Sequence, residues 1–447
     1  MKSIKLQNLF KFLLLICVCI VSTIFLYTNL KKTNKEKELI TYSINNEIIL
    51  PSNLYLLDSI SNRIFFQPLA KRWKPNDYII RATLDGNYIH LENKLLLESI
   101  KDSSIINLAL IDYNTFDTIQ NISSRINISK PYNSKDSISI QFLGDSYTQG
   151  LYFKKAIIDW KYVPNVKLIG SRNFDGIKHE GRGGWTLKNY FSNKKTNDFF
   201  YNPFFQPDGD LKYWGTTAFW KNCISLNTDK NKKSFNITYN CKGYDISGYG
   251  KDGRRLIPQV NDLMWDSNKN SYIIWDGEKW AIKDSIDNLS WNFNYKKYLE
   301  MYNFDKPDIL VVMLGLNDFR SGTLNPNFSE WNKQMNVLFK SYKTAVPNGK
   351  MIICIPCSSC GVMDNKEGNF TKRQNAIMWE VRKNIIKEFD KREDEGLYIV
   401  DTAITIDNEN GYNKDDKGIQ IGNPHPYLDY PEIGKPIAAI IQYIRNL

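Results

Sequence analysis

Two hydrophobic patterns follow each other along the chain and change near residue 136. The first consists of short apolar runs separated by turn residues, and Asp85-Gly86 is typical of a hairpin turn. The runs that predict strands are Glu47–Leu50, Asn53–Leu57, Arg63–Phe66, Tyr78–Leu84 and Ile106–Ile111. Residues 126–136 are expected to form a polar connection. The absence of long helical periods predicts a small β-sandwich domain over residues 47–135.

From residue 136 onward, strand patterns alternate with helix patterns. The expected strands are residues 138–143, 166–169, 307–314, 351–355 and 398–400, and the expected helices are residues 151–160, 329–345, 372–393 and 433–444. The uninterrupted apolar run at 309–314 is typical of a central parallel strand. This alternation predicts an α/β domain over residues 136–447, with a parallel sheet that helices cover on both faces.

Residues 191–297 interrupt the alternation and are unusually rich in aromatic side chains. The segment is too long for a single crossover, so we expect an insertion near the ligand-binding edge of the sheet. Its rings either form a core of their own or offer stacking surfaces to a ligand.

Length and charge narrow the function classes. A chain of 447 residues has room for two or three domains, and an apolar content of 42% excludes wholesale disorder. The formal net charge is +11, but the basic residues are spread along the chain without an arginine-rich stripe. This argues against nucleic-acid binding and leaves attraction to acidic glycans or anionic surfaces open.

The first residues have the pattern of a targeting segment. Lys2, Lys5 and Lys11 precede an uncharged apolar run over residues 12–27. This predicts a signal peptide or uncleaved signal anchor over residues 1–30, followed by a polar linker over residues 31–46. We therefore expect export to the periplasm, the cell surface or the medium. Membrane anchoring through residues 9–30 stays open.

The chain has seven cysteines, of which two lie in the apolar run at 12–27 and the other five form two groups. Cys223 and Cys241 flank a polar stretch and would close a small disulfide loop in an oxidising compartment. Cys354, Cys357 and Cys360 have C-x-x-C-x-x-C spacing, but the first lies in an expected strand and no fourth ligand follows at ferredoxin-like spacing. We expect buried thiols there and no metal site.

Gly144-Asp145-Ser146 stands where an expected strand ends and a helix begins. Such a turn places a hydroxyl at the edge of a sheet, near the positive end of a helix, where a nucleophile belongs. Taken alone, the motif also fits a serine that merely caps the helix.

Three later stretches bear on Ser146. A glycine-rich turn holds Gly181, Gly183 and Gly184, and can present backbone N–H groups to a ligand. Asn317 directly follows the strand at 309–314, at the edge where open α/β sheets place their sites, and its amide can donate to an oxyanion. His425 stands between two prolines, a setting that favours a positioned base.

These blocks, in this order, resemble the SGNH hydrolase superfamily, also called GDSL esterases. The resemblance implies a three-layer, flavodoxin-like domain. It also implies that Ser146 is the nucleophile and His425 the base, and that the oxyanion hole consists of the N–H groups of Ser146 and Gly184 with the side chain of Asn317. Gly181 or Gly183 are the alternatives to Gly184. The sequence from Glu180 to Thr186 is similar to that of exported bacterial members that act on glycans. Those members often carry a small β-domain upstream.

One position departs from that pattern. The family usually has an aspartate three residues before its histidine, and here this position is Gly422. Either a backbone carbonyl or Asn423 orients the imidazole, or another acid does so, with Asp415, Asp416 and Asp429 nearby in sequence. Weakened or lost catalysis is the third alternative, because the acid of a triad is worth orders of magnitude in rate.

We therefore expect an exported serine esterase that removes acyl groups, above all acetyl, from carbohydrate without a metal or cofactor. A lipid or small-ester hydrolase is the alternative enzyme. A glycan-binding surface protein with a degenerate hydrolase fold is the alternative of another class. The joint presence of Ser146, Asn317 and His425 favours an enzyme, because a binding protein has no need of all three.

Overall fold

The computed structural model of the protein describes residues 47–71, 77–89, 94–98, 100–132, 135–174, 176–192, 202–216, 259–266, 268–277, 280–282, 289–320, 322–357, 372–408, 410–412, 425–426 and 431–447. Residues 47–447 form one compact unit. The expected signal segment and linker lie outside the described residues. Among the described residues, no helix is both long and apolar enough to cross a bilayer.

The N-terminal part of this unit consists of strands, as predicted. They are β1 (Asn53–Leu57), β2 (Asn62–Phe65), β3 (Tyr78–Leu84), β4 (Asn87–Tyr88), β5 (Lys94–Leu97), β6 (Ile105–Asp112) and β7 (Thr118–Ser129). Five of them form a sheet in the order β1-β7-β6-β3-β4, and β2 pairs with β5. Both sheets contribute side chains to one hydrophobic cluster, and the β3–β4 hairpin turns at Asp85-Gly86. Together with the helices of the second part, described below, these strands give the mixed α/β class that the sequence predicts.

Two predictions in this part are wrong. Residues 126–129 are not a connection but the end of β7, because Arg125–Ser129 pair in parallel with the whole of β1. The expected strand at 47–50 is reduced to a single bridge between Ile48 and Ala70. In both places a partner distant in sequence decides the conformation, and a local pattern does not contain that information.

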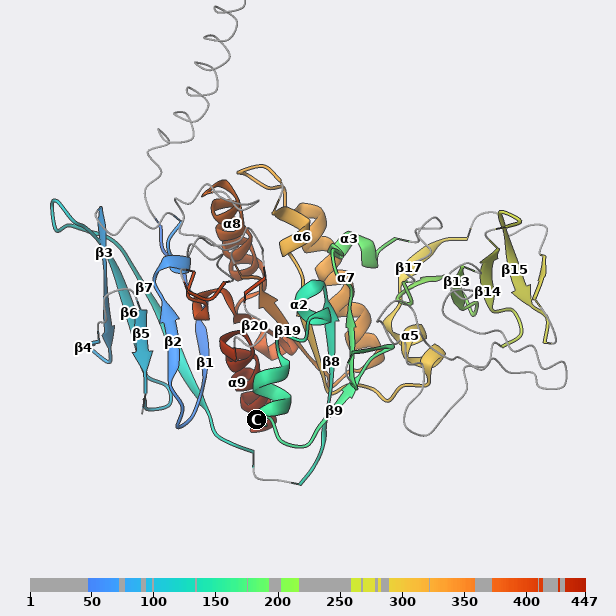
Figure 1. Ribbon diagram of the computed structural model, residues 1–447, viewed down its shortest axis with the longest axis horizontal. Helices are drawn as coiled ribbons and strands as arrows, with labels where there is room; N and C mark the ends of the chain where they lie inside the picture. The colour runs from blue at the N-terminus through green and yellow to red at the C-terminus, as the bar shows by residue number, and fades with distance from the viewer. Residues whose placement is uncertain are drawn as a thin grey trace, which may run out of the picture. The chain divides into compact units, whose positions relative to one another are not determined.

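The second part is built on one sheet in the order β10-β11-β8-β18-β19-β20, with β9 also paired to β8 (Figure 1). Its strands are β8 (Ile138–Gly144), β9 (Val166–Ile169), β10 (Arg172–Phe174), β11 (Ile177–Gly181), β18 (Ile309–Met313), β19 (Lys350–Ile355) and β20 (Leu397–Asp401). All pairings are parallel except that of β10 with β11. The carboxyl ends of β8, β11 and β18 therefore share one edge of the sheet.

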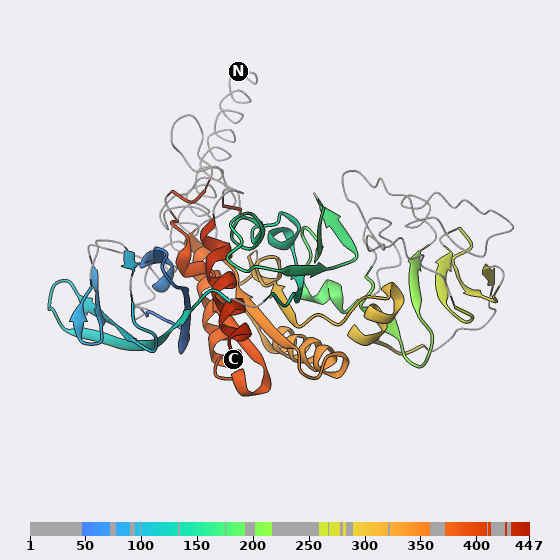
Figure 2. The same cartoon turned by 90° about the horizontal axis from the view of Figure 1, so that it is seen from below.

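The helices are α2 (Ser146–Gln149), α3 (Leu187–Tyr190), α5 (Tyr295–Tyr302), α6 (Leu316–Phe319), α7 (Ser329–Ala345), α8 (Lys372–Phe389) and α9 (Gly434–Arg445). Helix α8 packs against β19 and β20, and α9 packs against β20 and β1 (Figure 2). Helix α7 has the predicted bounds, whereas α8 ends four residues before the predicted Glu393. The carboxylate of Asp390, just beyond α8, binds Ser52, and Lys391 has a left-handed φ of 62°.

The expected helix at 151–160 is wrong. Helix α2 is a single turn that begins earlier, at Ser146, and Leu151 has a left-handed φ of 56° that ends it. A short π-helical segment, Lys155–Asp159, follows. The apolar residues that suggested one helix are buried from these separate turns.

The described parts of the insertion form small sheets. Strands β12 (Phe205–Pro207) and β17 (Trp291–Phe293) pair with each other, and β13 (Tyr213–Thr216), β14 (Leu263–Asp266), β15 (Ser271–Trp275) and β16 (Trp280–Ile282) form a four-stranded sheet. Phe204, Tyr213 and Trp214 are buried in the large core cluster. These three aromatic residues therefore belong to the core of the large sheet and do not form a separate core of their own, as one of the two alternatives expected.

Strand β1 joins the two parts. Its side chains alternate in direction, as in any strand. Leu54 and Leu56 lie in the cluster of the N-terminal sheets, whereas Tyr55 and Leu57 lie in the cluster of the large sheet. The two cores are thus separated by one strand.

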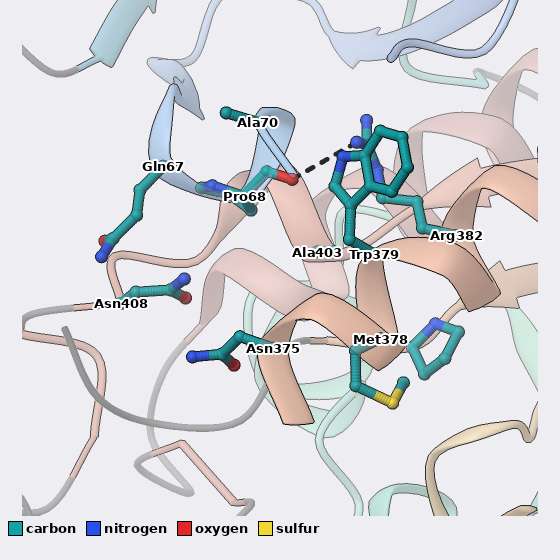
Figure 3. Close-up of a pocket in the computed structure, with 10 residues that line it drawn as sticks. Gln67, Pro68, Ala70, Asn375, Met378, Trp379, Arg382, Ala403 and Asn408 are labelled. Atoms are coloured by element: carbon teal, nitrogen blue, oxygen red, sulfur yellow. Dashed lines mark hydrogen bonds between the residues drawn. The ribbon is translucent and has the colours of Figure 1, made fainter. Parts of the chain in front are cut away.

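A buried arginine also ties the two parts together (Figure 3). Arg382 on α8 pairs with Asp401 at the end of β20, with Nε 2.6 Å from Oδ2. Its other nitrogens donate to the carbonyl oxygens of Ile49 (2.5 Å) and Pro68 (3.3 Å). A cavity of about 20 Å³ lies beside it, lined in part by the amide side chains of Gln67 and Asn375. Such a volume has room for about one water molecule.

We expect Arg382→Ala to lower the free energy of unfolding by about 3–5 kcal/mol, because it leaves the Asp401 carboxylate buried without its cation. Lys383→Ala is the matched control. Lys383 is 39% exposed and pairs with Glu47, which is 35% exposed, so its loss costs less than about 1 kcal/mol. Denaturant unfolding of both variants measures the difference, and equal losses would contradict this account.

Candidate active site

Ser146 is the first residue of α2, directly after β8. The N-cap of this helix is Asp145, whose carboxylate accepts a hydrogen bond from the Tyr147 N–H at 3.0 Å. The capping role that the sequence left open for Ser146 therefore belongs to its neighbour. The Ser146 hydroxyl is half-buried at the carboxyl edge of the sheet and is left for another partner.

That partner is His425. Its Nε2 lies 2.7 Å from Ser146 Oγ, although the two residues are 279 positions apart in the chain. The imidazole packs against a pair of neighbouring tyrosine rings, with centroids 5.5 Å from Tyr147 and 6.0 Å from Tyr152. The Tyr152 hydroxyl donates to the carbonyl oxygen of Pro426 at 3.1 Å, which fixes the backbone beside the histidine.

The segment of residues 181–185, here called the glycine strap, runs from the end of β11 past the start of α2. Four of its five N–H groups have acceptors: His179 Nδ1 for Gly181 (2.9 Å), Gly144 O for Arg182 (2.8 Å), Gln149 Oε1 for Gly183 (2.5 Å) and Arg182 O for Trp185 (3.1 Å). Among the described residues, the N–H of Gly184 has no acceptor. Gly184 has a φ of +77°, a conformation that glycine adopts without strain.

Asn317 connects the strap with the serine turn. It lies on α6, after β18, and its Nδ2 is 3.1 Å from Trp185 O and 3.3 Å from Asp145 Oδ2. These acceptors belong to the residue after Gly184 and the residue before Ser146. The structure therefore brings Ser146, Gly184, Asn317 and His425 to one edge of the sheet.

Two buried carboxyl groups support the turns at this edge. The pKa of Asp145 is raised to about 7, mainly by burial and in addition by charge repulsion from Asp318. Burial also raises the pKa of Asp318 to about 6, and its carboxylate accepts from the Leu187 N–H at 2.8 Å. Both groups accept hydrogen bonds from backbone N–H groups and thereby brace the two turns.

Burial lowers the pKa of His425 below its usual value of 6.5, and the positive charge of Arg320 lowers it further. The imidazole is therefore neutral, and able to accept a proton, at a lower pH than a free histidine. Arg320 is the C-cap residue directly after α6 and follows Asn317 by three residues, a spacing that puts both on the same side of a helical turn. That spacing was the one signal in the sequence for this residue, which the motif comparison did not select.

The group that orients His425 stays a prediction. Gly422, Asn423, Asp415, Asp416 and Asp429 all lie outside the described residues.

The described cysteines are buried thiols, as predicted. Cys354 and Cys357 are both free and buried, and burial raises the pKa of each. Cys357 Sγ lies 3.6 Å from the Thr402 hydroxyl. Cys223, Cys241 and Cys360 lie outside the described residues.

No protein-family model matches the chain, and no curated protein matches it either. Solved structures with a similar arrangement include an acetyl esterase mutant with acetate ion (14% identity, 69% of this chain and 99% of that chain, TM-score 0.32). A carbohydrate esterase of family 3 from Talaromyces cellulolyticus has 14% identity, the same coverage and a TM-score of 0.30. A family two carbohydrate esterase from Clostridium thermocellum, in complex with cellohexaose, has 11% identity, 88% and 91% coverage and a TM-score of 0.29. All three are esterases. At these TM-scores the geometry at Ser146, and not the overall likeness, is the basis for a function.

We expect Arg320→Gln to move the acid limb of a pH–activity profile to higher pH. Removing the positive charge favours the protonated imidazole, so the pKa of His425 rises and the base is lost at a higher pH. The measurement is kcat/KM for an uncharged ester across pH 4–8. Arg63→Gln removes the same charge from an exposed site on β2 and should leave the limb in place. An unmoved limb in Arg320→Gln would show that Arg320 does not act on the group that titrates.

Proposed function

We propose that the protein is a serine ester hydrolase, with Ser146 as nucleophile and His425 as general base. The observation that carries this proposal is the 2.7 Å contact between Ser146 Oγ and His425 Nε2. A serine hydroxyl is a weak nucleophile by itself, and a neutral imidazole at hydrogen-bond distance takes its proton as it attacks. The lowered pKa of His425 favours the neutral form that this role needs.

The proposed oxyanion hole consists of the N–H groups of Ser146 and Gly184 and the side-chain amide of Asn317. Two observations support it. Among the described residues, neither N–H has an acceptor, whereas those of Gly181 and Gly183 are bonded. The amide of Asn317 donates to Trp185 O at 3.1 Å and, over a longer 3.3 Å, to Asp145 Oδ2, and in the proposed reaction the oxyanion replaces Asp145 as the acceptor of that second N–H. Donors aimed at one point before the reaction are the most effective way to stabilise a developing oxyanion.

The chemistry then runs in two halves. Ser146 Oγ forms a bond to the acyl carbon while its proton moves to His425 Nε2, and the carbonyl oxygen becomes the oxyanion. The bond to the alcohol breaks, and the alcohol leaves with the proton from Nε2. Water attacks the acyl-enzyme and gives a proton to Nε2, which returns it to Oγ as the acid leaves. No metal or cofactor takes part in these steps.

For the substrate we propose an acylated carbohydrate, with acetyl the expected acyl group. The motif resemblance and the predicted export segment support this choice, and the net charge of +11 is compatible with acidic glycans. A lipid or small ester is the alternative substrate. We place a β-sandwich-like domain at 47–135 and the hydrolase domain at 136–447, and export through residues 1–30 belongs to the same proposal.

We expect the wild-type protein to hydrolyse p-nitrophenyl acetate and to release acetate from acetylated polysaccharides, and Ser146→Ala to reduce turnover to the buffer rate. A fluorophosphonate reagent should label wild type on Ser146 and leave the variant unlabelled, as mass spectrometry will show. Ser329→Ala, at an exposed serine that opens α7, is the control and should retain both properties.

Wild-type turnover no higher than that of Ser146→Ala would overturn the esterase proposal. Retained binding of a glycan in that case would favour the alternative of a binding protein with a degenerate hydrolase fold. A panel of acetylated polysaccharides and acyl lipids separates the two proposed substrate classes.

We also expect Asn317→Ala to lower kcat by about 10²–10³-fold, since an oxyanion donor acts mainly in the transition state. KM should change much less. Asn325→Ala, an exposed asparagine beyond α6, serves as control. Steady-state kinetics on one ester would contradict the assignment if KM rose and kcat did not fall.

A further inference from the structure

A buried ion pair joins Arg182 of the glycine strap to Glu180, the residue just before the strap. Arg182 Nη1 is 2.9 Å from Glu180 Oε2, and the two side chains are only 3% and 0% exposed. Moving both charges out of water costs several kcal/mol each, so a buried pair is weak evidence for a gain in stability. The contacts of this pair point to another purpose.

Arg182 is held from several directions. Its backbone N–H donates to Gly144 O, two residues before Ser146, and its Nη1 also donates to Glu180 O at 3.1 Å. Its guanidinium lies over the rings of Trp185 (5.0 Å) and Tyr190 (5.6 Å). The Tyr190 hydroxyl in turn donates to Gly144 O and Glu180 O, both at 2.8 Å. The charge therefore packs against the ring of the last strap residue.

Glu180 is fixed from the opposite side. Its Oε1 accepts hydrogen bonds from the Ser171 N–H and from the Tyr298 hydroxyl, the latter at 2.7 Å. Tyr298 lies on α5, which follows the insertion, and its oxygen accepts from Gln141 Nε2 on β8 at 2.8 Å. Together these contacts give the carboxylate one orientation.

Both proposed donors outside the serine turn depend on this arrangement. Gly184 lies between Arg182 and Trp185 in the strap, and Asn317 donates to Trp185 O. We propose that the Glu180–Arg182 pair is a positioning element that aims the Gly184 N–H and the Asn317 amide at the oxyanion. This inference rests on the proposed esterase function. A misplacement of about 1 Å can cost about 10²-fold in rate. An ion pair that holds the strap in place can therefore raise the rate even where it adds nothing to the free energy of unfolding.

The first test is Arg182→Met, which keeps the apolar stem of the side chain and removes the charge and the Nη1 hydrogen bonds. We expect kcat to fall by about 10²-fold and KM to change by less than about threefold, because the loss falls on the transition state. The matched control is Arg382→Met, which breaks an equally buried arginine–carboxylate pair at α8 and β20. It should lower the unfolding midpoint without this loss of kcat.

Arg182→Met leaves Glu180 buried without its cation, so the variant can be too unstable to assay. The double variant Glu180→Gln with Arg182→Met removes both charges and should unfold near the wild-type midpoint, while kcat stays low. Recovery of kcat together with stability would show that the pair is merely structural and overturn the proposal. Tyr298→Phe, which removes the 2.7 Å bond to Glu180 together with the bond that the hydroxyl accepts from Gln141, should lower kcat about three- to tenfold. A wild-type kcat in both the double variant and Tyr298→Phe would also overturn the proposal.

A readout without turnover separates this inference from the proposed function. Hydrogen exchange of the peptide that covers residues 181–185 should speed up at least tenfold in the double variant and not in Arg382→Met. Unchanged exchange would overturn the positioning role even in an active esterase. Absence of wild-type ester hydrolysis, with faster exchange in the variant, would overturn the proposed function and leave the Glu180–Arg182 pair as the support of the strap.

Discussion

The arrangement at the carboxyl edge of the large sheet depends on a close approach of three backbones at Gly144. This residue ends β8 and lies opposite Met313 of β18 on one side and Gly181 of β11 on the other. A Cβ at Gly144 would lie 2.4 Å from Met313 O and 2.3 Å from Thr148 Oγ1, so no other residue fits without movement. Because the three strands meet here, the N–H of Asp145 donates to Met313 O and the N–H of Arg182 donates to Gly144 O, which ties the serine turn to β18 and to the glycine strap.

The edge carries an electrostatic cost. Asp145 and Asp318 have raised pKa values, about 7 and about 6, because burial disfavours their charged forms. A carboxyl whose pKa is raised on folding stabilises the fold at low pH, and this contribution is lost as pH rises from about 4 through 6–7. The imidazole of His425, in contrast, becomes neutral only as the pH rises. The fold therefore gives up some stability where the proposed base is active, as sites with strongly shifted pKa values often do.

The sequence was most informative where a local pattern coincides with a complete element. Helix α7 and strands β1, β3 and β9 have their predicted bounds, because each is decided by its own periodicity and flanking residues. Leu151 could not be foreseen, since nothing local reveals a left-handed residue that divides an apolar stretch. The four candidate site residues were found because each follows a recognisable strand or turn. Arg182 and Tyr298 were missed, because their importance lies in contacts between segments that no pattern connects.

Tyr298 has a consequence for how this protein can be altered. Its hydroxyl lies on α5, just after the insertion, where it donates to Glu180 beside the strap and accepts from Gln141 of β8. An exchange of strands β12–β17 should therefore end before α5 and keep the residues that the large core buries, such as Phe204, Tyr213 and Trp214. A chimaera that exchanges these strands but keeps Tyr295–Tyr302 keeps the hydrogen bond between Tyr298 and Glu180. A chimaera joined after Tyr302 loses this bond.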